Sequence, residues 1–385
     1  MTNQDRSAEG IKSDPVEVAT RLLAMYLPQY HPIPENDAWW GKGFTEWTNV
    51  TRSLPKFRGH YQPHLPKDLG FYDLRVPEVR EMQAELARGY GVSGFCYYHY
   101  WFNGRRLLER PLTEVLKSGK PNFPFCVCWA NENWTRRWDG HEREILIGQE
   151  YSADDDGRHI QALLPMFADS RYIRVAGKPL FAVYRTSHLP DPKRSTDIWR
   201  EEAQRAGIGE LFLCRFEAWD DLSSPDPRSI GFDAAVEFAP DWRRAGGQDF
   251  TGWKAKALAG AGLLPRSYRE NRFFDYRCMV ASMIQRETPN YPLLRGVTPG
   301  FDNSARRKTG AMIIRHSSPE AYGKWLRFAI EWTERHHASD QRLVFVNAWN
   351  EWAEGNHLEP DMQHGLAYLD ETLEAVNAYS GHRDR

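Results

Sequence analysis

The sequence predicts an α/β protein built as a single (β/α)8 barrel with long insertions in its βα loops. Three observations support this fold: eight short apolar segments, helical patterns between many of them, and a chain of 385 residues. The apolar segments are nearly continuous, which is typical of parallel strands buried on both faces. Eight such segments in one chain favour a barrel over a doubly wound sheet, and no GxGxxG motif follows the first of them.

Each predicted strand ends in polar and aromatic residues. The eight strands cover 21–31, 91–101, 123–134, 178–185, 210–219, 232–238, 291–303 and 342–352. The predicted helices cover 76–91, 155–169, 195–208 and 318–337. Pro77 marks the first turn of the first helix, and Gly89 and Gly91 mark its end. Ser318 and Pro319 mark the start of the last helix. The alternation of strands and helices predicts a parallel sheet.

The chain is expected to form one folded domain. Residues 1–20 are polar and contain no apolar run, so we expect a disordered N-terminal tail ahead of a catalytic barrel at 21–385. Two regions, 28–75 and 239–290, interrupt the pattern as long insertions. Insertions at the carboxyl-terminal face of a barrel build its binding pocket.

Composition argues against several classes of partner. With 50 basic and 52 acidic residues the net charge is −2, and no long basic run is present, which disfavours nucleic acid and anionic membranes. The N-terminus lacks a secretory signal, and no segment approaches the roughly 18 apolar residues of a membrane span. We therefore expect a cytoplasmic protein without a membrane span. The five cysteines contain no CxxC pair and are expected to be buried thiols.

Aromatic and polar residues gather where the predicted strands end. The chain has 15 Trp, 17 Tyr and 19 Phe, and flat aromatic faces suit sugar rings. Carboxylates at the same ends supply the acid and base groups of glycoside chemistry. Glu217 and Trp219 stand at the end of one further strand, and Glu237 stands at the end of another. The candidate saccharide-binding residues are Tyr26, Tyr30, His31, Trp47, Tyr98, His99, Trp129, Asn131, Glu132, Trp134, Asp302, Trp349 and Asn350.

Two geometric expectations follow from these positions. The first is that one cavity is faced by Tyr26, His99, Glu132, Asp302 and Glu351. The second is that the cavity is lined by at least two of Trp40, Trp47, Trp129 and Trp134.

Glu351 and Glu354 are the candidate catalytic residues. They follow the last predicted strand and are flanked by Trp349 and Trp352. On a helical turn, residues three apart have Cβ atoms roughly 5–6 Å apart. Two carboxylates that close push one pKa upward, which separates an acid from a base. The alternative is that both glutamates are solvated in a loop, and the buried strand and flanking tryptophans argue against it.

No cofactor or metal is expected from the motifs. The sequence contains no HExxH motif, no Cys/His pair with zinc spacing and no phosphate-binding loop. The segment 357–364 contains ligand-type residues without a recognised spacing. The acidic run at 154–156 precedes a helix, where acidic residues are ordinary.

Five long motifs resemble the WbsX-like family, which is glycoside hydrolase family 99-like and common in bacterial O-antigen and capsule gene clusters. The motifs are YLPQYHPIPENDAWWGKGFTEWTNV, GFCYYHYWF, WANENWTRRWDG, PGFDNSARR and NAWNEWAEGNHLEPD. The resemblance covers about residues 21–375. The last motif is also similar to the NEWHEG segment of family 99 endo-α-mannosidases and endomannanases, which are (β/α)8 barrels.

The resemblance implies a mechanism. Glu351 would act as the base on the 2-hydroxyl of the substrate itself, and Glu354 would act first as acid and then as base. The 2-oxygen would displace the leaving group and form a 1,2-anhydro sugar, which favours α-manno-configured sugars such as mannose or D-rhamnose. Ala353 stands where NEWHEG has histidine.

The sequence therefore predicts a retaining glycoside hydrolase that acts on α-manno linkages of an oligo- or polysaccharide. One alternative is a glycosyltransferase or assembly factor of O-antigen or capsule synthesis, which would need a nucleotide-diphosphate site. Another alternative is a non-catalytic glycan-binding barrel, which would keep the aromatic residues and would not need both glutamates.

Overall fold

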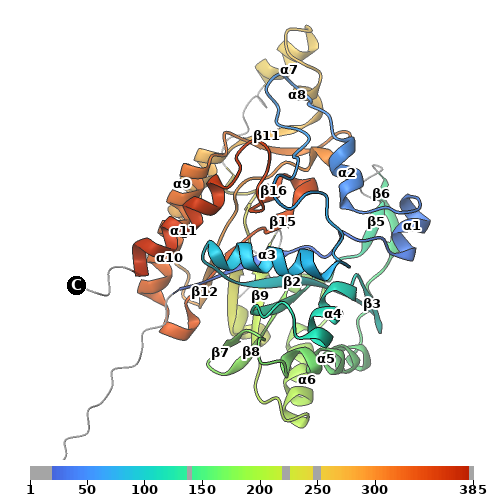
Figure 1. The fold of residues 1–385 in the computed structure, drawn as a ribbon, viewed down its shortest axis with the longest axis vertical. Helices are drawn as coiled ribbons and strands as arrows, with labels where there is room; N and C mark the ends of the chain where they lie inside the picture. Colours follow the sequence, from blue (N-terminus) through green and yellow to red (C-terminus); the bar gives the residue numbers. More distant parts are fainter. Residues whose placement is uncertain (1–19, 137–140, 219–225, 246–252, 381–385) are drawn as a thin grey trace, which may run out of the picture.

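Eight parallel strands close into a barrel in the computed structural model, which describes residues 20–136, 141–218, 226–245 and 253–380 (Figure 1). Their order is β1-β14-β12-β10-β9-β8-β4-β2, and β2 pairs with β1 to close the ring. The barrel strands are β1 (Arg21–Tyr26), β2 (Val92–Phe102), β4 (Phe125–Trp129), β8 (Lys178–Val183), β9 (Phe212–Glu217), β10 (Ala234–Glu237), β12 (Leu293–Val297) and β14 (Leu343–Val346). Each predicted strand corresponds to one of these, and the (β/α)8 fold is confirmed.

Helices surround the barrel. They are α3 (Pro77–Gly89), α4 (Arg110–Ser118), α5 (Ala153–Phe167), α6 (Pro192–Arg205), α9 (Tyr276–Ile284), α10 (Pro319–His336) and α11 (Ala367–Ser380). The four predicted helices correspond to α3, α5, α6 and α10. Between β9 and β10 the described residues form only a 3-10 turn, η4 (Pro227–Ile230).

Side-chain caps fix the starts of the helices. The Asp191 carboxylate accepts a hydrogen bond from the Arg194 amide at the start of α6. The Ser318 hydroxyl accepts one from the Ala321 amide at the start of α10, and Pro319 occupies the first turn. These contacts satisfy amides that have no partner inside the helix, which is why the sequence marks these boundaries well.

Several strands are shorter than their apolar patterns. The predicted strand 21–31 ends at Tyr26, and the predicted strand 291–303 ends at Val297. Pro28 and Pro299 follow these ends, and proline cannot donate a hydrogen bond to a neighbouring strand. The apolar pattern continues because the loops beyond the strands remain packed on the barrel.

The insertions are more numerous than predicted. Region 28–75 contains α1 (Pro34–Trp40) and α2 (Glu46–Arg52). Region 239–290 contains α7 (Trp253–Gly260), α8 (Ser267–Glu270) and β11 (Arg272–Asp275), but its last part is the barrel helix α9.

Two excursions from the barrel were not predicted. One is the hairpin of β5 (Trp134–Arg136) and β6 (His141–Ile147). The other is the β12–α10 loop, which contains η5 (Asn303–Ala305) and β13 (Met312–Arg315). Figure 1 shows α7 and α8 at the top of the molecule, beyond α2 and β11.

Minor elements complete the chain. They are β3 (Arg105–Leu107), β7 (Arg174–Val175), η2 (Thr186–His188), η6 (Ser339–Gln341), β15 (Asn350–Glu351), η7 (Trp352–Glu354) and β16 (Asn356–His357). In the described part of the chain, no helix combines the length and apolar character that crossing a membrane requires.

The cysteines are free thiols. Cys96, Cys126, Cys128 and Cys214 are buried, as expected for residues on barrel strands. Cys278 is exposed, which corrects the expectation that all five are buried. It lies in α9, and one side of a surface helix faces solvent.

Asn350 ties the end of β14 to the end of β1. Its side-chain oxygen accepts a hydrogen bond from the Leu27 amide at 2.7 Å. Its side-chain nitrogen donates to the Leu27 carbonyl at 3.1 Å and to the Tyr72 hydroxyl at 3.3 Å. The residue is buried, so its amide serves both polar groups of Leu27 where the strands no longer pair.

We expect Asn350→Ala to lower the free energy of unfolding by about 3 kcal/mol, because the buried polar groups of Leu27 lose their partner. Urea denaturation followed by circular dichroism measures this change. Asn122 is exposed, so Asn122→Ala is the control and is expected to stay within about 0.5 kcal/mol of the unaltered protein. An equally small effect of Asn350→Ala would contradict the bridging role.

Candidate active site

A pocket of about 220 Å³ opens at the carboxyl-terminal ends of the barrel strands. Tyr98 and Tyr100 of β2 line it, together with Tyr184 after β8, Phe238 after β10 and Asn347 after β14. These five residues, from the ends of four strands, therefore meet at one cavity. This is the place where (β/α)8 enzymes carry their active sites.

Tryptophans from two insertions form the wall of this active-site pocket. Trp39 and Trp40 come from α1, and Trp134 comes from β5. The rings of Trp39 and Trp134 meet edge to face, with centroids 5.9 Å apart. The expectation that at least two of four named tryptophans line the cavity is confirmed by Trp40 and Trp134. Their flat indole faces are suited to stacking on sugar rings.

One guanidinium joins three carboxylates at the pocket. Arg306 donates from Nη2 to Glu351 at 3.0 Å and from Nη1 to Glu354 at 2.6 Å. Its Nε donates to Glu46 at 3.1 Å. Glu351 and Glu354 line the pocket, whereas Glu46 is fully buried behind it. The adjacent nitrogens of one planar group thus hold the predicted catalytic pair close together.

The two pocket glutamates differ in their surroundings. Burial is the main cause that raises the pKa of Glu351 to about 8. The positive charge of Arg306 opposes this shift, and the negative charges of Glu354 and Glu46 add to it. Three ionised carboxylates around one guanidinium would carry a net charge of −2. Glu351, the more buried of the two pocket glutamates, therefore retains a proton near neutral pH.

Tyr30, Trp47 and Asn350 support the turn that carries Glu351 and Glu354, and they do not line the pocket. The Tyr30 hydroxyl donates to the Asn350 carbonyl at 2.5 Å and accepts from the Trp352 amide at 3.1 Å. The Trp47 ring packs on Trp352 with centroids 5.6 Å apart. Its Nε1 donates to the Tyr72 carbonyl at 2.8 Å.

His99 and Trp129 face away from the pocket. Successive residues of a strand point to opposite faces, so His99 points outward where its neighbour Tyr98 points inward. His99 Nε2 lies 3.0 Å from Nε2 of His159 in α5. Trp129 donates from Nε1 to the Trp101 carbonyl at 3.3 Å, also outside the barrel.

Asn131 and Glu132 have different roles. Asn131 exchanges two hydrogen bonds with the backbone of Arg185, each 2.8 Å long, and so joins the ends of β4 and β8. Glu132 lines the pocket, and Arg185 donates from Nη1 to its carboxylate at 2.9 Å.

Tyr26, His31 and Trp349 are buried outside the pocket. The Tyr26 hydroxyl donates to Gln83 of α3 at 2.7 Å. Burial lowers the pKa of His31 to about 4, so its ring is neutral at pH 7. Trp349 packs against Phe95 with centroids 5.2 Å apart.

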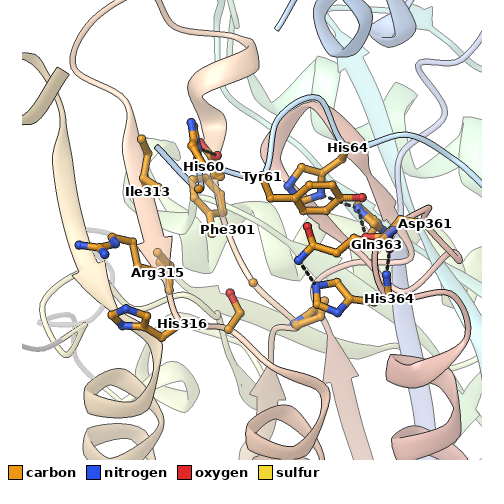
Figure 2. Close-up of a pocket in the computed structure, with 18 of the residues that line it drawn as sticks. His60, Tyr61, His64, Phe301, Ile313, Arg315, His316, Asp361, Gln363 and His364 are labelled. Atoms are coloured by element: carbon orange, nitrogen blue, oxygen red, sulfur yellow. Dashed lines mark hydrogen bonds and ion pairs between the residues drawn. The ribbon is translucent and has the colours of Figure 1, made fainter. Parts of the chain in front are cut away.

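Asp302 lies in a second pocket, of about 250 Å³ (Figure 2). Its Oδ2 is 2.6 Å from His60 Nε2 and accepts from Gln62 Nε2 at 2.9 Å. Burial alone would raise the pKa of Asp302, but these hydrogen bonds outweigh it and hold the pKa below the usual value.

The expectation that five residues share one cavity is therefore wrong for three of them. Glu132 and Glu351 line the active-site pocket, whereas Asp302 lines the second pocket. Tyr26 and His99 are buried against helices outside the barrel. All five stand near strand ends, but position along a strand does not decide which face a side chain takes.

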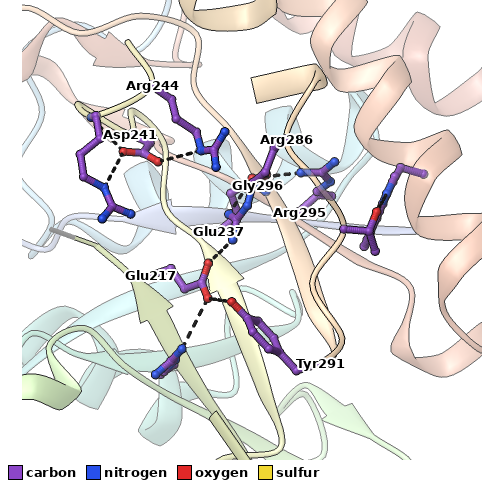
Figure 3. Close-up of polar contacts among 12 residues, drawn as sticks. Glu217, Glu237, Asp241, Arg244, Arg286, Tyr291, Arg295 and Gly296 are labelled. Carbon is purple, nitrogen blue, oxygen red and sulfur yellow. Dashed lines mark hydrogen bonds and ion pairs between the residues drawn. The ribbon is translucent and has the colours of Figure 1, made fainter. Parts of the chain in front are cut away.

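Glu217 and Glu237 also lie away from the active-site pocket. Figure 3 shows them within a cluster of ion pairs. Arg286 donates to both glutamates, and Arg295 donates to Glu237 at 3.0 Å. These arginines occupy the side of the barrel where β9 and β10 are joined without an α-helix in the described residues. Trp219 lies outside the described residues.

Sequence reasoning missed Arg306, Glu46 and Trp39 as site residues. Each lies inside a motif that carries the family resemblance. Arg306 follows η5, in an excursion that the strand and helix patterns did not predict. An arginine or glutamate in a loop has no local pattern that distinguishes a buried ion pair from a solvated side chain.

Comparisons with known proteins find a matching family model and related sequences. The family model described as Glycosyltransferase WbsX matches residues 22–372. Two relatives, each called uncharacterized protein WxcX, come from two strains of Xanthomonas campestris pv. campestris. Each is 46% identical over 362 residues, which cover 94% of this chain. The chain spans about half the length of these relatives, since the match covers 50% of each.

Solved structures show the same fold. The family 99 endo-α-mannosidase from Bacteroides thetaiotaomicron, in complex with bis-tris propane, has a TM-score of 0.56 at 16% identity. The similarity covers 95% of this chain and 99% of that one. A glycoside hydrolase-like protein also has a TM-score of 0.56, at 12% identity, over 96% of this chain and 97% of that one.

We expect Arg306→Gln to raise the pKa of Glu351 above its value of about 8, because the nearest opposing positive charge is removed. Carbon-13 NMR titration of glutamate-labelled protein measures this pKa, and the Glu351→Gln variant assigns the signal. The neighbouring change Arg307→Gln is the control and should leave that pKa unchanged. A pKa of Glu351 that falls or stays constant in Arg306→Gln would show that the guanidinium does not control the pair.

Proposed function

The chain belongs to the Glycosyltransferase WbsX family, and from this premise and the pocket geometry we propose that it cleaves glycosidic bonds of a bacterial polysaccharide. The proposed reaction is retaining hydrolysis of α-manno-configured linkages, of the mannose or D-rhamnose type. The observation that carries it is the pair Glu351 and Glu354, held by Arg306 at a tryptophan-walled pocket on the catalytic face of the barrel.

The residues of the pair take the roles that the resemblance implies. Glu351 removes the proton of the substrate 2-hydroxyl, and the 2-oxygen then forms a bond to C1. The bond from C1 to the leaving oxygen breaks, and Glu354 gives that oxygen a proton. Water opens the resulting 1,2-anhydro sugar: Glu354 takes a proton from the water, and Glu351 returns its proton to the 2-oxygen. The sum is hydrolysis, with both glutamates restored.

The electrostatics of the site support a strong base at Glu351. A sugar hydroxyl is a weak acid, and a carboxylate of raised pKa accepts its proton more readily than an ordinary one. Burial, which raises the pKa of Glu351 to about 8, therefore strengthens the base once it is ionised. The cost is that only a minor fraction of Glu351 is ionised at pH 7 in the free protein.

Transfer to a sugar acceptor is a second candidate, and the description of the family as glycosyltransferases favours it. A sugar hydroxyl can open a 1,2-anhydro sugar in place of water, using the same two glutamates. Transfer from a nucleotide sugar would instead require a diphosphate site. Product analysis with mannan and rhamnan oligosaccharides, with and without nucleotide sugars, distinguishes these reactions.

We expect Glu351→Gln and Glu354→Gln each to lower turnover of a natural α-mannoside at least about 100-fold, because general acid–base catalysis contributes roughly 10²–10⁴. An aryl mannoside with a good leaving group needs little protonation. Glu354→Gln should therefore regain much of its rate on that substrate, whereas Glu351→Gln should stay slow. Initial rates on both substrates measure the difference.

Glu109→Gln is a control for loss of a glutamate, because Glu109 is exposed at the start of α4. Circular dichroism verifies that all three variants fold. Near-normal rates in both catalytic variants would end the proposed mechanism. Recovery of Glu351→Gln alone on the activated substrate would reverse the two assignments.

The pH dependence tests the role of Glu351 separately. A base must be ionised to act, so kcat/KM should rise from about pH 6 to about pH 9, following the pKa of Glu351 near 8. An acid would give the opposite sign, with activity falling as pH passes that pKa. Rates are measured on the activated substrate, where protonation by Glu354 matters least. A fall in kcat/KM over this range would exclude Glu351 as the base.

A further inference from the structure

We propose that His64, His357 and Asp361, which line the second pocket, form a binding site for a divalent transition-metal ion of the zinc class. One potential ligand atom from each residue lies within 4.8 Å of the other two. Two imidazoles and one carboxylate are a ligand set typical of zinc, and three protein ligands leave one position open.

The distances fit one shared ion. His64 Nδ1 lies 2.9 Å from His357 Nε2, and His357 Nε2 lies 3.8 Å from Asp361 Oδ2. Ligand atoms about 2.0–2.1 Å from a tetrahedral ion are separated by about 3.3 Å, which falls between these two values. The 3.8 Å separation is too long for a hydrogen bond, but it suits two atoms on either side of an ion.

A surrounding layer of contacts orients the ligands. The Nδ1 atom of His357 lies 2.9 Å from the Glu359 carbonyl, which can only accept a hydrogen bond. Nδ1 therefore carries the proton, and Nε2 presents a lone pair to the cluster. Metal-binding histidines are commonly oriented in this way. Asp361 Oδ1 accepts from the Gln363 amide at 3.0 Å, and this leaves Oδ2 directed at His357.

The ring of His357 is also held in place by packing. It stacks on Trp352 with centroids 3.8 Å apart. This packing fixes the orientation of the His357 ring relative to the cluster.

Sequence spacing could not reveal this site. His64 lies in the first insertion, 293 residues before His357, and the absence of a zinc motif led us to expect no metal. His357 and Asp361 are four residues apart, but His357 lies in β16 and Asp361 follows that strand, so they do not lie on a helix. Only the fold brings the first insertion against this segment.

A bound ion would brace the main chain next to the catalytic pair. Gly355 follows Glu354, and a Cβ added at Gly355 would lie 3.1 Å from His64 Nε2. The Glu354 carbonyl also accepts a hydrogen bond from the Asp302 amide at 2.5 Å. The proposed site therefore joins the first insertion to the turn that carries Glu354, but none of its ligands lines the active-site pocket.

The test uses the full chain with Cys278→Ser, because Cys278 is the exposed thiol and could bind metals by itself. Equilibrium dialysis against Zn2+ followed by elemental analysis is expected to give one ion per chain. His64→Ala and His357→Ala should each weaken binding at least about tenfold. Excess Mg2+ should not displace the ion, because magnesium prefers oxygen ligands.

His316→Ala is the matched control. His316 lines the same pocket, but Figure 2 shows it across the pocket from His64 and Asp361. Its Nδ1 lies 2.8 Å from Asp275 Oδ2 instead. This variant should keep the full stoichiometry and affinity for Zn2+.

A second measurement does not depend on the folding of any variant. Co2+ bound to the chain with intact ligands should show the intense visible absorption of a four-coordinate site, and Zn2+ should abolish it. Zn2+ should also raise the thermal midpoint by a few degrees. Failure to retain Zn2+, equal binding by His64→Ala and His316→Ala, or only the weak absorption of six-coordinate Co2+ would overturn the proposal. None of these measurements uses glycosidase activity, so the metal site and the proposed reaction can fail separately.

Discussion

The site depends on one buried cation, the guanidinium of Arg306, surrounded by the carboxylates of Glu46, Glu351 and Glu354. Removing ionised groups from water costs several kcal/mol for each ion, and only close, well-oriented partners offset that cost. The partners come from α2, the β12–α10 loop and the end of β14. These segments are neighbours because β1, β14 and β12 are adjacent around the closed barrel. The ion cluster therefore fixes how two long excursions fold over the strand ends.

Beneath this cluster, buried polar groups hold the turn that carries Glu351 and Glu354. Glu359 accepts hydrogen bonds from Trp352, Gln83 and Tyr72, and burial raises its pKa to about 7. Asn350 joins the same turn to the end of β1. Such second-layer contacts restrict the positions of reactive groups more tightly than a loop alone could. Asn350 and Trp352 of the NEWAEG segment, together with Glu359, thus support the turn, and none of the three lines the active-site pocket.

The barrel could be predicted from the sequence because each strand is a compact apolar segment and several helices have side-chain caps. The direction in which each strand side chain points, into the barrel or away from it, could not be predicted. Strands buried on both faces show no polar–apolar alternation, so nothing local distinguishes inward Tyr98 from outward His99. The catalytic pair could be proposed because both glutamates lie within a single motif. The roles of Arg306 and Glu46 could not be predicted, because their contact joins segments 260 residues apart. The same limit applies to the proposed metal ligands.

The shared guanidinium also suggests how two glutamates three residues apart can do different chemistry. Arg306 attracts both carboxylates, so the difference in their surroundings arises from their exposure to solvent. The Glu351 side chain is 8% exposed, and that of Glu354 is 24% exposed. The more buried carboxylate gains less hydration on ionising, and its pKa therefore rises. A substrate that fills the pocket would remove water from Glu354 as well and bring its environment closer to that of Glu351. Loss of that water would favour the protonated form of Glu354, which is the form that gives the leaving oxygen its proton in the proposed mechanism.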